Sequence, residues 1–340
     1  MSAGSDGVVV VALDAMGGDR APAEPVRGAL LAAGPALRVL LVGDEPALLG
    51  ELDGRQGGAS AVEVVHAPAV IGADEEGARA VKAKPDASLV VAHRLAAEGR
   101  AQAVVSAGHT GAMLAAGALV LRRVPGVLRP AIAVVLPSRG GPVVLIDGGA
   151  NPDVRPEHLP QFALMGTLLA RDVLGVAAPR VGLLSIGEEA GKGSELVQVA
   201  HAALLGSPGF VGNVEGRDIP RGAVDVVVTD GFTGNVALKL YEGAAAAIFA
   251  EVREALAASV RGRLAGALAR PALRGLRRRI DPEEYGGAYL LGVRGLSVIA
   301  HGNSSGRGIA NAVRLAARGV REGLVGQLEA GLAGRGAPVG

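Results

Sequence analysis

Short runs of aliphatic residues alternate along this chain with longer segments of helical periodicity. Most positions in these runs are valine, isoleucine or leucine, which is typical of strands buried on both faces of a sheet. Ten or more residues separate most of the runs, and this spacing is typical of βαβ units in a mostly parallel sheet covered by helices. The predicted strands span residues 8–13, 39–42, 62–65, 103–106, 131–136, 143–146, 181–186, 224–228 and 297–300.

Two of these runs predict a local reversal of the chain. Only residues 137–142 join the runs at 131–136 and 143–146, and a connection this short suits an antiparallel hairpin. No Pro/Ser-rich linker or change of composition divides the chain, so we expect one domain over residues 1–330. Residues 331–340 have little apolar content and are expected to form a flexible tail.

A helical segment at about residues 240–282 differs from the rest of the chain. Residues 241–260 are rich in alanine, and Pro271 is expected to divide the remainder into two helices. Leucines at helical spacing predict a small apolar face on this segment. They are Leu264, Leu268, Leu273 and Leu276.

The same segment is strongly basic. No acid occurs between residues 255 and 280, so a basic face is expected beside the apolar one. This combination suits an anionic membrane surface, and a solvated helical hairpin or a dimer arm fits the pattern equally well. The arginines are Arg261, Arg263, Arg270, Arg274, Arg277, Arg278 and Arg279.

The composition excludes several kinds of chemistry. The chain has 340 residues, of which 49% are hydrophobic and 20% charged, enough to bury a large core. It has no cysteine, so disulfides and a cysteine nucleophile are excluded and a reducing cytoplasm is the expected compartment. A net charge of +1 and 2% aromatic residues argue against nucleic-acid binding. No signal peptide or apolar run of roughly 18 residues is visible, so we expect a soluble protein.

Polar, glycine-rich segments follow six of the predicted strands, at residues 14–19, 106–111, 147–151, 185–193, 229–235 and 301–306. Ordinary turns use the same residue types, but six together predict a crevice at one edge of a parallel sheet. Glycines and helix N-termini favour a phosphate there. The candidate binding residues are Asp14, Gly17, Gly18, Ser106, Gly108, His109, Thr110, Gly111, Asp147, Asn151, Asp230, Thr233 and Gly234.

The chain lacks the common motifs for nucleotide binding, serine hydrolysis and metal binding. The segment from Gly187 to Gly193 is one residue short of a Walker A loop, and no GxGxxG follows the first strand. The GxSxG around Ser304 is followed by no Asp or His, which excludes the order of a serine hydrolase. The histidines form no close ligand pair, so no metal site is predicted. His109 and His301 lie in the polar loops and keep a functional interpretation.

Taken together, the loops resemble the PlsX family, the acyl-(acyl-carrier-protein):phosphate acyltransferases of bacterial phospholipid synthesis. The similarity runs in order from about residue 8 to residue 315. The segments that carry it are VALDAMGGDRAP, SAGHTGAMLAAG, RPAIAVVLPS, LIDGGAN, FALMG, LLSIGEEAGKGSEL, FVGNVEGRDI, VDVVVTDGFTGNVALKLYEG, and YGGAYLLGVRG with VIAHG.

The resemblance implies that inorganic phosphate attacks the thioester of a fatty acyl-carrier protein, giving acyl phosphate and free carrier protein without a cofactor. It implies a Rossmann-like three-layer α/β/α sandwich, similar to phosphotransacetylases and isocitrate-dehydrogenase-like enzymes, with a protruding helical hairpin. It also implies a homodimer at the inner face of the membrane that passes acyl phosphate to a membrane glycerol-3-phosphate acyltransferase.

Three catalytic residues follow from the resemblance. Lys192 of the EEAGKG loop is expected to neutralise the phosphate or the leaving sulfur, and Asn235, at the start of a helix, to donate to the thioester oxygen. His301 is a weaker candidate for protonating the thiolate. The chain departs from the family at His109, at Ser194 and at residues 303–307, which leaves acyl selectivity open.

Three other functions remain compatible with the sequence. A phosphotransacetylase acting on acyl-CoA shares the chemistry. A metal-dependent dehydrogenase of the related fold needs clustered aspartates and a nicotinamide site. A relative without catalytic activity keeps the fold and binds lipid.

Overall fold

The computed structural model describes residues 7–53 and 59–333, so most of the predicted tail lies outside the described residues. The strands are β1 (Val9–Asp14), β2 (Leu37–Gly43), β3 (Val62–His66), β4 (Ala103–Ser106), β5 (Ala131–Leu136), β6 (Val143–Ile146), β7 (Val181–Leu184), β8 (Phe210–Val214), β9 (Val226–Val228), β10 (Ala288–Leu291) and β11 (Leu296–Ile299).

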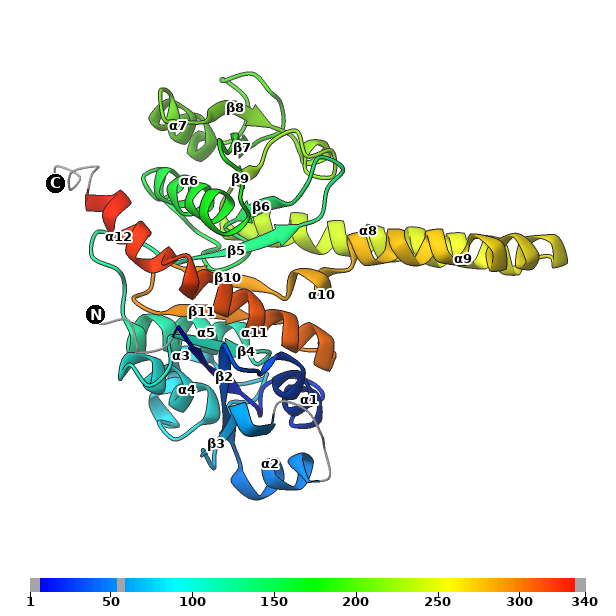
Figure 1. Cartoon of the computed structure of the whole chain (residues 1–340). Helices are drawn as coiled ribbons and strands as arrows, with labels where there is room; N and C mark the ends of the chain where they lie inside the picture. The colour runs from blue at the N-terminus through cyan, green and yellow to red at the C-terminus, as the bar shows by residue number, and fades with distance from the viewer. Residues whose placement is uncertain (1–6, 54–58, 334–340) are drawn as a thin grey trace.

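Helices connect most of these strands, as the alternating pattern predicts (Figure 1). Short 3-10 or π segments, η1 (Ala59–Ala61), η2 (Gly117–Leu121), η3 (Leu169–Val173) and η4 (Gly216–Asp218), lie between or extend them. The helices are α1 (Ala23–Ala32), α2 (Glu45–Leu52), α3 (Gly77–Ala83), α4 (Ser88–Ala97), α5 (Thr110–Ala116), α6 (His158–Leu168), α7 (Glu195–Leu204), α8 (Gly231–Ala257), α9 (Val260–Ile280), α10 (Pro282–Tyr285), α11 (Gly306–Arg321) and α12 (Leu324–Ala333).

The described strands form one 11-stranded sheet in the order β3-β2-β1-β4-β11-β10-β5-β6-β9-β7-β8. Strands β1, β2, β3, β4 and β11 run parallel to one another. Strand β10 is antiparallel to both of its neighbours, and β5 and β6 form the predicted antiparallel hairpin. Strands β6, β9, β7 and β8 are again mutually parallel. The sheet therefore consists of two parallel blocks that run in opposite directions.

Two strands, β8 and β10, were not predicted from the sequence. Strand β8 is an edge strand with glycine and asparagine within it, and part of it is exposed. Strand β10 is a buried run of only four residues. Neither has the long aliphatic pattern by which the other strands were predicted, because edge position and brevity weaken that signal.

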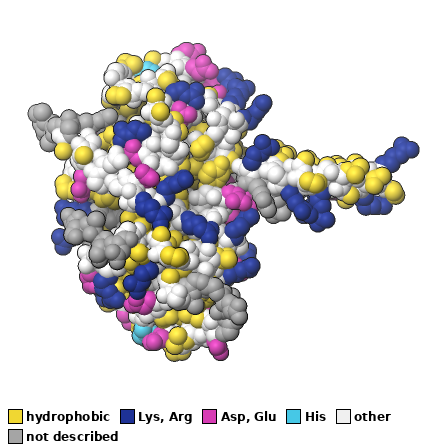
Figure 2. Space-filling model, viewed as in Figure 1, with side chains coloured by type: hydrophobic (Ala, Val, Ile, Leu, Met, Phe, Trp, Pro, Cys, Tyr) yellow, Lys and Arg dark blue, Asp and Glu magenta, His cyan; other side chains and the backbone are white. Residues whose placement is uncertain are grey.

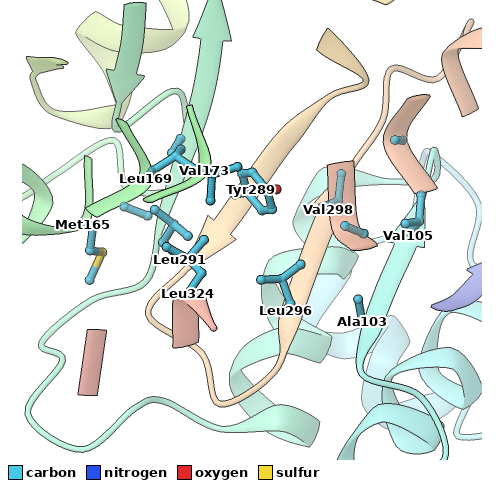
Figure 3. Packing of buried hydrophobic residues seen from close by; sticks show 14 of the residues in the cluster. Ala103, Val105, Met165, Leu169, Val173, Tyr289, Leu291, Leu296, Val298 and Leu324 are labelled. Carbon is cyan, nitrogen blue, oxygen red and sulfur yellow. The ribbon is translucent and has the colours of Figure 1, made fainter. Parts of the chain in front are cut away.

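Helices cover both faces of the sheet, giving the expected three layers. One buried cluster joins the sheet to side chains of α1, α6, α7, α11 and α12, and a second joins it to α3, α4, α5 and α8. Figure 3 shows part of the first cluster, where Tyr289 and Leu291 of β10 lie between Leu169 of η3 and Leu296 of β11. Burying such side chains stabilises the fold by about 1.5–3 kcal/mol each.

Helices α8 and α9 form a hairpin that projects from the sheet (Figure 1). The prediction that Pro271 divides the second helix is wrong, because α9 continues through it. A proline within a helix removes one backbone hydrogen bond, and the remaining bonds hold the helix together here. The chain instead reverses just before α9, where Ser259 Oγ accepts a hydrogen bond from the Gly262 N–H at 2.9 Å.

The projecting hairpin carries hydrophobic and basic side chains along its length (Figure 2). Leu264, Leu268 and Leu276 are exposed, and Leu273 is partly buried. Arg263 and Arg270 are exposed beside them. In the described part of the chain no helix is long and apolar enough to cross a bilayer.

Candidate functional site

The six polar loops lie in two groups, and the prediction that they share one edge is wrong. Residues 14–19, 106–111 and 301–306 follow parallel strands β1, β4 and β11 and form the first loop group. Residues 147–151, 185–193 and 229–235 follow β6, β7 and β9 and form the second loop group. The antiparallel strands between the two blocks reverse the direction, so the two sets of carboxyl ends lie at opposite edges of the sheet. Hydrophobic patterning carries no information on strand direction, which explains the error.

Asp147 organises the second loop group. Its carboxylate is fully buried and accepts hydrogen bonds from the backbone N–H groups of Ile132, Gly149, Ala150 and Asn151 at 2.7–3.1 Å, and from the Asn151 side chain at 2.8 Å. Burial raises the pKa of Asp147, and these donors oppose that rise. The N–H groups of this loop are thus bonded to a protein carboxylate, which excludes the loop as a phosphate cradle.

Asp230 begins helix α8 by accepting a hydrogen bond from the Thr233 N–H at 2.8 Å. Gly234 packs so closely on the loop after β6 that a Cβ there would lie 1.9 Å from the Asp147 carbonyl oxygen. Asn235 lies in the second turn of α8, so the expectation that it opens the helix is wrong and a capping role is excluded. A Cβ at Gly149 would lie 3.5 Å from its amide carbon, which places this side chain over the Asp147 loop.

Lys192 is an exposed residue in the loop between β7 and α7. Its N–H donates to the Glu189 carbonyl at 3.0 Å and closes a turn. Helix α7 begins after Ser194, and no side chain caps it among the described residues. The N–H groups of its first turn therefore lack a side-chain acceptor, and Lys192 lies two residues before the N-cap.

Large apolar side chains flank these polar groups on the surface. Ile186 of the Lys192 loop is 83% exposed, and Phe232 of α8 is 66% exposed. Val236 and Leu240 follow Phe232 at intervals of four residues and are also exposed. This spacing puts the three α8 side chains on one side of the helix, next to Asn235.

The first loop group is held together by its own polar contacts. Ser106 Oγ donates to the Asp14 carboxylate at 2.6 Å, and the Gly108 N–H donates to Ser106 Oγ at 2.9 Å. A Cβ at Gly17 would lie 2.6 Å from the same carboxylate, so only glycine fits there, and Gly18 has a φ of +103°. Burial raises the pKa of Asp14, and the Ser106 hydroxyl opposes that rise.

His109 precedes helix α5, as predicted, and its Nδ1 accepts a hydrogen bond from the Ala112 N–H at 3.2 Å. Thr110 is exposed at the first position of α5, and a Cβ at Gly111 would lie 2.9 Å from the His109 ring. The imidazole thus caps helix α5. This capping role is consistent with histidine being a tolerated departure from the family at this position.

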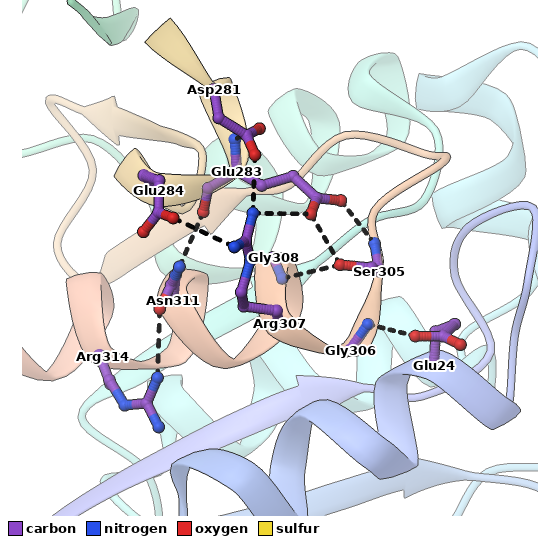
Figure 4. Close-up of polar contacts among 10 residues, drawn as sticks. All are labelled: Glu24, Asp281, Glu283, Glu284, Ser305, Gly306, Arg307, Gly308, Asn311 and Arg314. Carbon is purple, nitrogen blue, oxygen red and sulfur yellow. Dashed lines mark hydrogen bonds and ion pairs between the residues drawn. The ribbon is translucent and has the colours of Figure 1, made fainter. Parts of the chain in front are cut away.

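Protein carboxylates occupy the N-terminus of α11 in the first loop group (Figure 4). The Ser305 N–H and hydroxyl both donate to the Glu283 carboxylate at 2.7 Å, and the Gly306 N–H donates to Glu24. Arg307 completes the cluster through Asp281 at 2.6 Å. These acids take the place of an anion, so the altered segment 303–307 is bound to α10 rather than open to a phosphate.

His301 lies in the first loop group, whereas Lys192 and Asn235 lie in the second. Its Nε2 is 3.4 Å from Glu242 Oε1 of α8. Sequence reasoning gave no role to Glu242 or to Glu283, because their partners are distant in the sequence. In the described part of the chain no cluster of His, Asp and Glu suits a metal ion.

Comparisons with known proteins agree with the motifs. Residues 9–326 match the family described as "Fatty acid synthesis protein". A phosphate acyltransferase of Moorella thermoacetica is 50% identical over 322 residues, with 93% of each chain covered. A phosphate acyltransferase of Thermus thermophilus is 52% identical over 320 residues, covering 94% of this chain and 97% of that relative.

Solved structures share the fold at low sequence identity. A phosphotransacetylase of Streptococcus pyogenes superposes with a TM-score of 0.61 at 16% identity, covering 92% of this chain and 94% of that one. The EutD phosphotransacetylase of Staphylococcus aureus gives a TM-score of 0.59 at 17% identity with the same coverage. These neighbours confirm the mostly parallel α/β fold expected from the sequence.

Proposed function

This chain belongs to the PlsX family of phosphate acyltransferases, and we propose that it transfers a fatty acyl group from acyl-carrier protein to inorganic phosphate. The products are an acyl phosphate and the free carrier protein. No cofactor takes part, because phosphate is itself the nucleophile.

The observation that carries this proposal is which backbone N–H groups in the six loops have a side-chain acceptor and which do not. In five of them, N–H groups of the turn or the following helix donate to protein side chains, including Asp14, Asp147, Asp230 and Glu283. Among the described residues, the start of α7 has no such acceptor. An uncapped helix N-terminus beside a lysine favours a phosphate dianion. Glu195 in the same turn opposes an anion, which makes the charge of Lys192 necessary.

The second loop group supplies groups for each part of the reaction. A phosphate oxygen attacks the thioester carbonyl carbon, negative charge develops on the carbonyl oxygen, and the C–S bond then breaks to release the thiolate. Lys192 neutralises the phosphate or the leaving sulfur, and the Asn235 amide donates to the carbonyl oxygen. The two loops follow neighbouring parallel strands, β7 and β9, and therefore lie at the same edge of the sheet.

The apolar surface beside these groups suits a fatty acyl chain. Ile186, Phe232, Val236 and Leu240 lie within a few residues of Lys192 and Asn235 along the chain. Their exposed area favours contact with an apolar substrate. We assign the acyl chain to this surface and the carrier protein's phosphopantetheine arm to the space above the two polar groups.

The hairpin of α8 and α9 supports attachment to a membrane. Exposed leucines and arginines share this projecting element, and this composition favours an anionic lipid surface. We propose that the protein is a homodimer bound peripherally at the inner membrane face, where a membrane glycerol-3-phosphate acyltransferase receives the acyl phosphate.

The test is incubation of the full chain with phosphate and either a long-chain acyl-carrier protein or the matching acyl-CoA. Acyl phosphate is trapped with hydroxylamine and measured as the hydroxamate. We expect product from the acyl-carrier protein and little from acyl-CoA. Product from acyl-CoA alone would identify a phosphotransacetylase-like donor preference, and no product from either donor would contradict the proposed function.

A further inference from the structure

The loop that carries Lys192 is held by side chains on both sides of that residue. The Glu189 carbonyl accepts the Lys192 N–H at 3.0 Å and also the Asn213 Nδ2 at 2.9 Å. On the other side, the Gly193 carbonyl accepts Gln198 Nε2 at 3.1 Å. The backbone of Lys192 is therefore fixed although its side chain is exposed.

Asn213 is itself fixed by His201. Both side chains are buried, and His201 Nδ1 lies 2.9 Å from Asn213 Oδ1. Because the amide nitrogen of Asn213 donates to Glu189, its oxygen is the acceptor, and His201 Nδ1 must carry a proton. The Phe210 ring packs edge-on against the imidazole at 5.4 Å and limits its rotation.

Asn213 and Phe210 belong to the segment FVGNVEGRDI, one of the segments that resemble the family. It forms β8 and the following turn, beside the strand that leads into the Lys192 loop. Arg217 of the same segment lies 2.8 Å from Glu215 and 3.8 Å from Glu188 of the loop. Arg217 and Glu188 are exposed, so their pair is weak, and the buried amide of Asn213 is the main anchor.

We propose that Asn213, oriented by His201, is a positioning residue that fixes Lys192 against the N-terminus of α7. This inference rests on the proposed function, because it takes Lys192 as the group that meets phosphate. A misplacement of about 1 Å in such a group costs up to about a hundredfold in rate. The buried pair of His201 and Asn213 thus explains how the backbone of an exposed lysine keeps one position.

The substitution Asn213→Asp tests the role of the Asn213 amide with little change in the shape of the side chain. The carboxylate keeps the acceptor for His201 and loses the donor to the Glu189 carbonyl. We expect kcat/KM for phosphate to fall roughly ten- to a hundredfold through a raised KM for phosphate, with the KM for the acyl donor unchanged. Hydrogen exchange at the Lys192 amide should also become faster.

A matched control exists on α12. The Gln327 amide donates to the Glu322 carbonyl at 3.1 Å and accepts from Arg171 at 2.9 Å. Gln327→Glu loses the same kind of donor far from the Lys192 loop and should leave the KM for phosphate unchanged. An equal effect of both substitutions would contradict a positioning role for Asn213.

A double-substitution cycle separates this inference from the proposed function. If Asn213 acts through Lys192, adding Asn213→Asp to Lys192→Ala causes no further loss. Full activity of Asn213→Asp, or an additive loss in the double variant, overturns the inference, whereas a defect in Lys192→Ala together with product from the unmodified chain keeps the proposed function. Near-normal activity of Lys192→Ala overturns the inference and the role of Lys192, but its product still supports the proposed function, which only the absence of product from both donors contradicts. If Asn213→Asp does not fold, His201→Ala replaces it in the test. This variant leaves the Asn213 amide without the side chain that orients it, and it should raise the KM for phosphate by a smaller factor.

Discussion

His301 of the first loop group lies 3.4 Å from Glu242 of α8, measured between Nε2 and Oε1. Helix α8 begins in the second loop group, so this contact connects the two groups across the sheet. Asn235 and Glu242 are seven residues apart on α8, about 10 Å along the helix axis. A substrate that met both Asn235 and His301 would therefore have to extend along this part of α8.

The first prediction concerns this contact. We expect His301→Ala to lower kcat roughly a hundredfold if the imidazole protonates the leaving thiolate, and Glu242→Ala to lower it less by releasing the imidazole. The two effects should not add, because Glu242 acts through His301. Steady-state rates of hydroxamate formation measure this, and unchanged kcat in His301→Ala would remove the residue from the mechanism. The His301 side chain is exposed and that of Glu242 is partly exposed, so the coupling in stability should stay below about 1 kcal/mol.

The second prediction concerns Lys192 and Asn235. Removing a donor to a developing oxyanion typically costs roughly 10²–10³ in kcat, and we expect losses of this size in Lys192→Ala and Asn235→Ala. Lys239→Ala is the control, since Lys239 is an exposed lysine on α8. Acyl phosphate formation under saturating acyl-carrier protein gives the rates. Turnover close to that of the unmodified chain in both variants would contradict this assignment.

The third prediction concerns His93, which is buried in α4. Its Nδ1 lies 2.8 Å from the Leu89 carbonyl, and its Nε2 has no partner among the described residues. Burial lowers the pKa of His93 from 6.5 to about 4. Because the folded state resists protonation, the stability from the neutral imidazole is present above pH 6.5 and is lost as the pH falls toward 4.

This loss amounts to roughly 3 kcal/mol of unfolding free energy between pH 6.5 and pH 4. His93→Gln removes the titrating group, so the stability difference between the unmodified chain and the variant should narrow by about that amount over the same range. Urea unfolding at a series of pH values measures it. His66→Gln, at an exposed histidine, is the control. A stability difference that does not change with pH would contradict the lowered pKa of His93.

The fourth prediction concerns the hairpin. Leu264 and Leu268 are 65% and 77% exposed, and burial of a leucine contributes about 1.5–3 kcal/mol. Replacing both with serine should lower partition into anionic vesicles at least about tenfold. Vesicle cosedimentation measures binding, and added salt should weaken it because the arginines contribute. Leu205→Ser, at a leucine that is 64% exposed on the body of the protein, should have no effect. Equal binding of all variants would exclude the hairpin as the membrane contact.

Local patterns in the sequence determined most of the elements. Strands such as β4, β5 and β6 begin and end where the aliphatic runs do, because burial on both faces requires an apolar run of that length. The short connection between β5 and β6 determined their antiparallel pairing. The polar loops at the strand ends, and the family similarity of the segments that contain Lys192 and Asn235, were also visible without a structure.

Only the tertiary structure decided how these parts meet. Strand direction separates the six loops into two groups, and the contacts of Glu283 and Asp147 determine which loops keep N–H groups for an anion. The position of Asn213 under the Lys192 loop likewise depends on the pairing of β8 with β7. Hydrogen-bond partners far apart in the chain leave no local pattern, because only the folded sheet brings them within 3 Å of each other. The sequence thus determined the elements and the candidate residues, while the fold decided which of them act together.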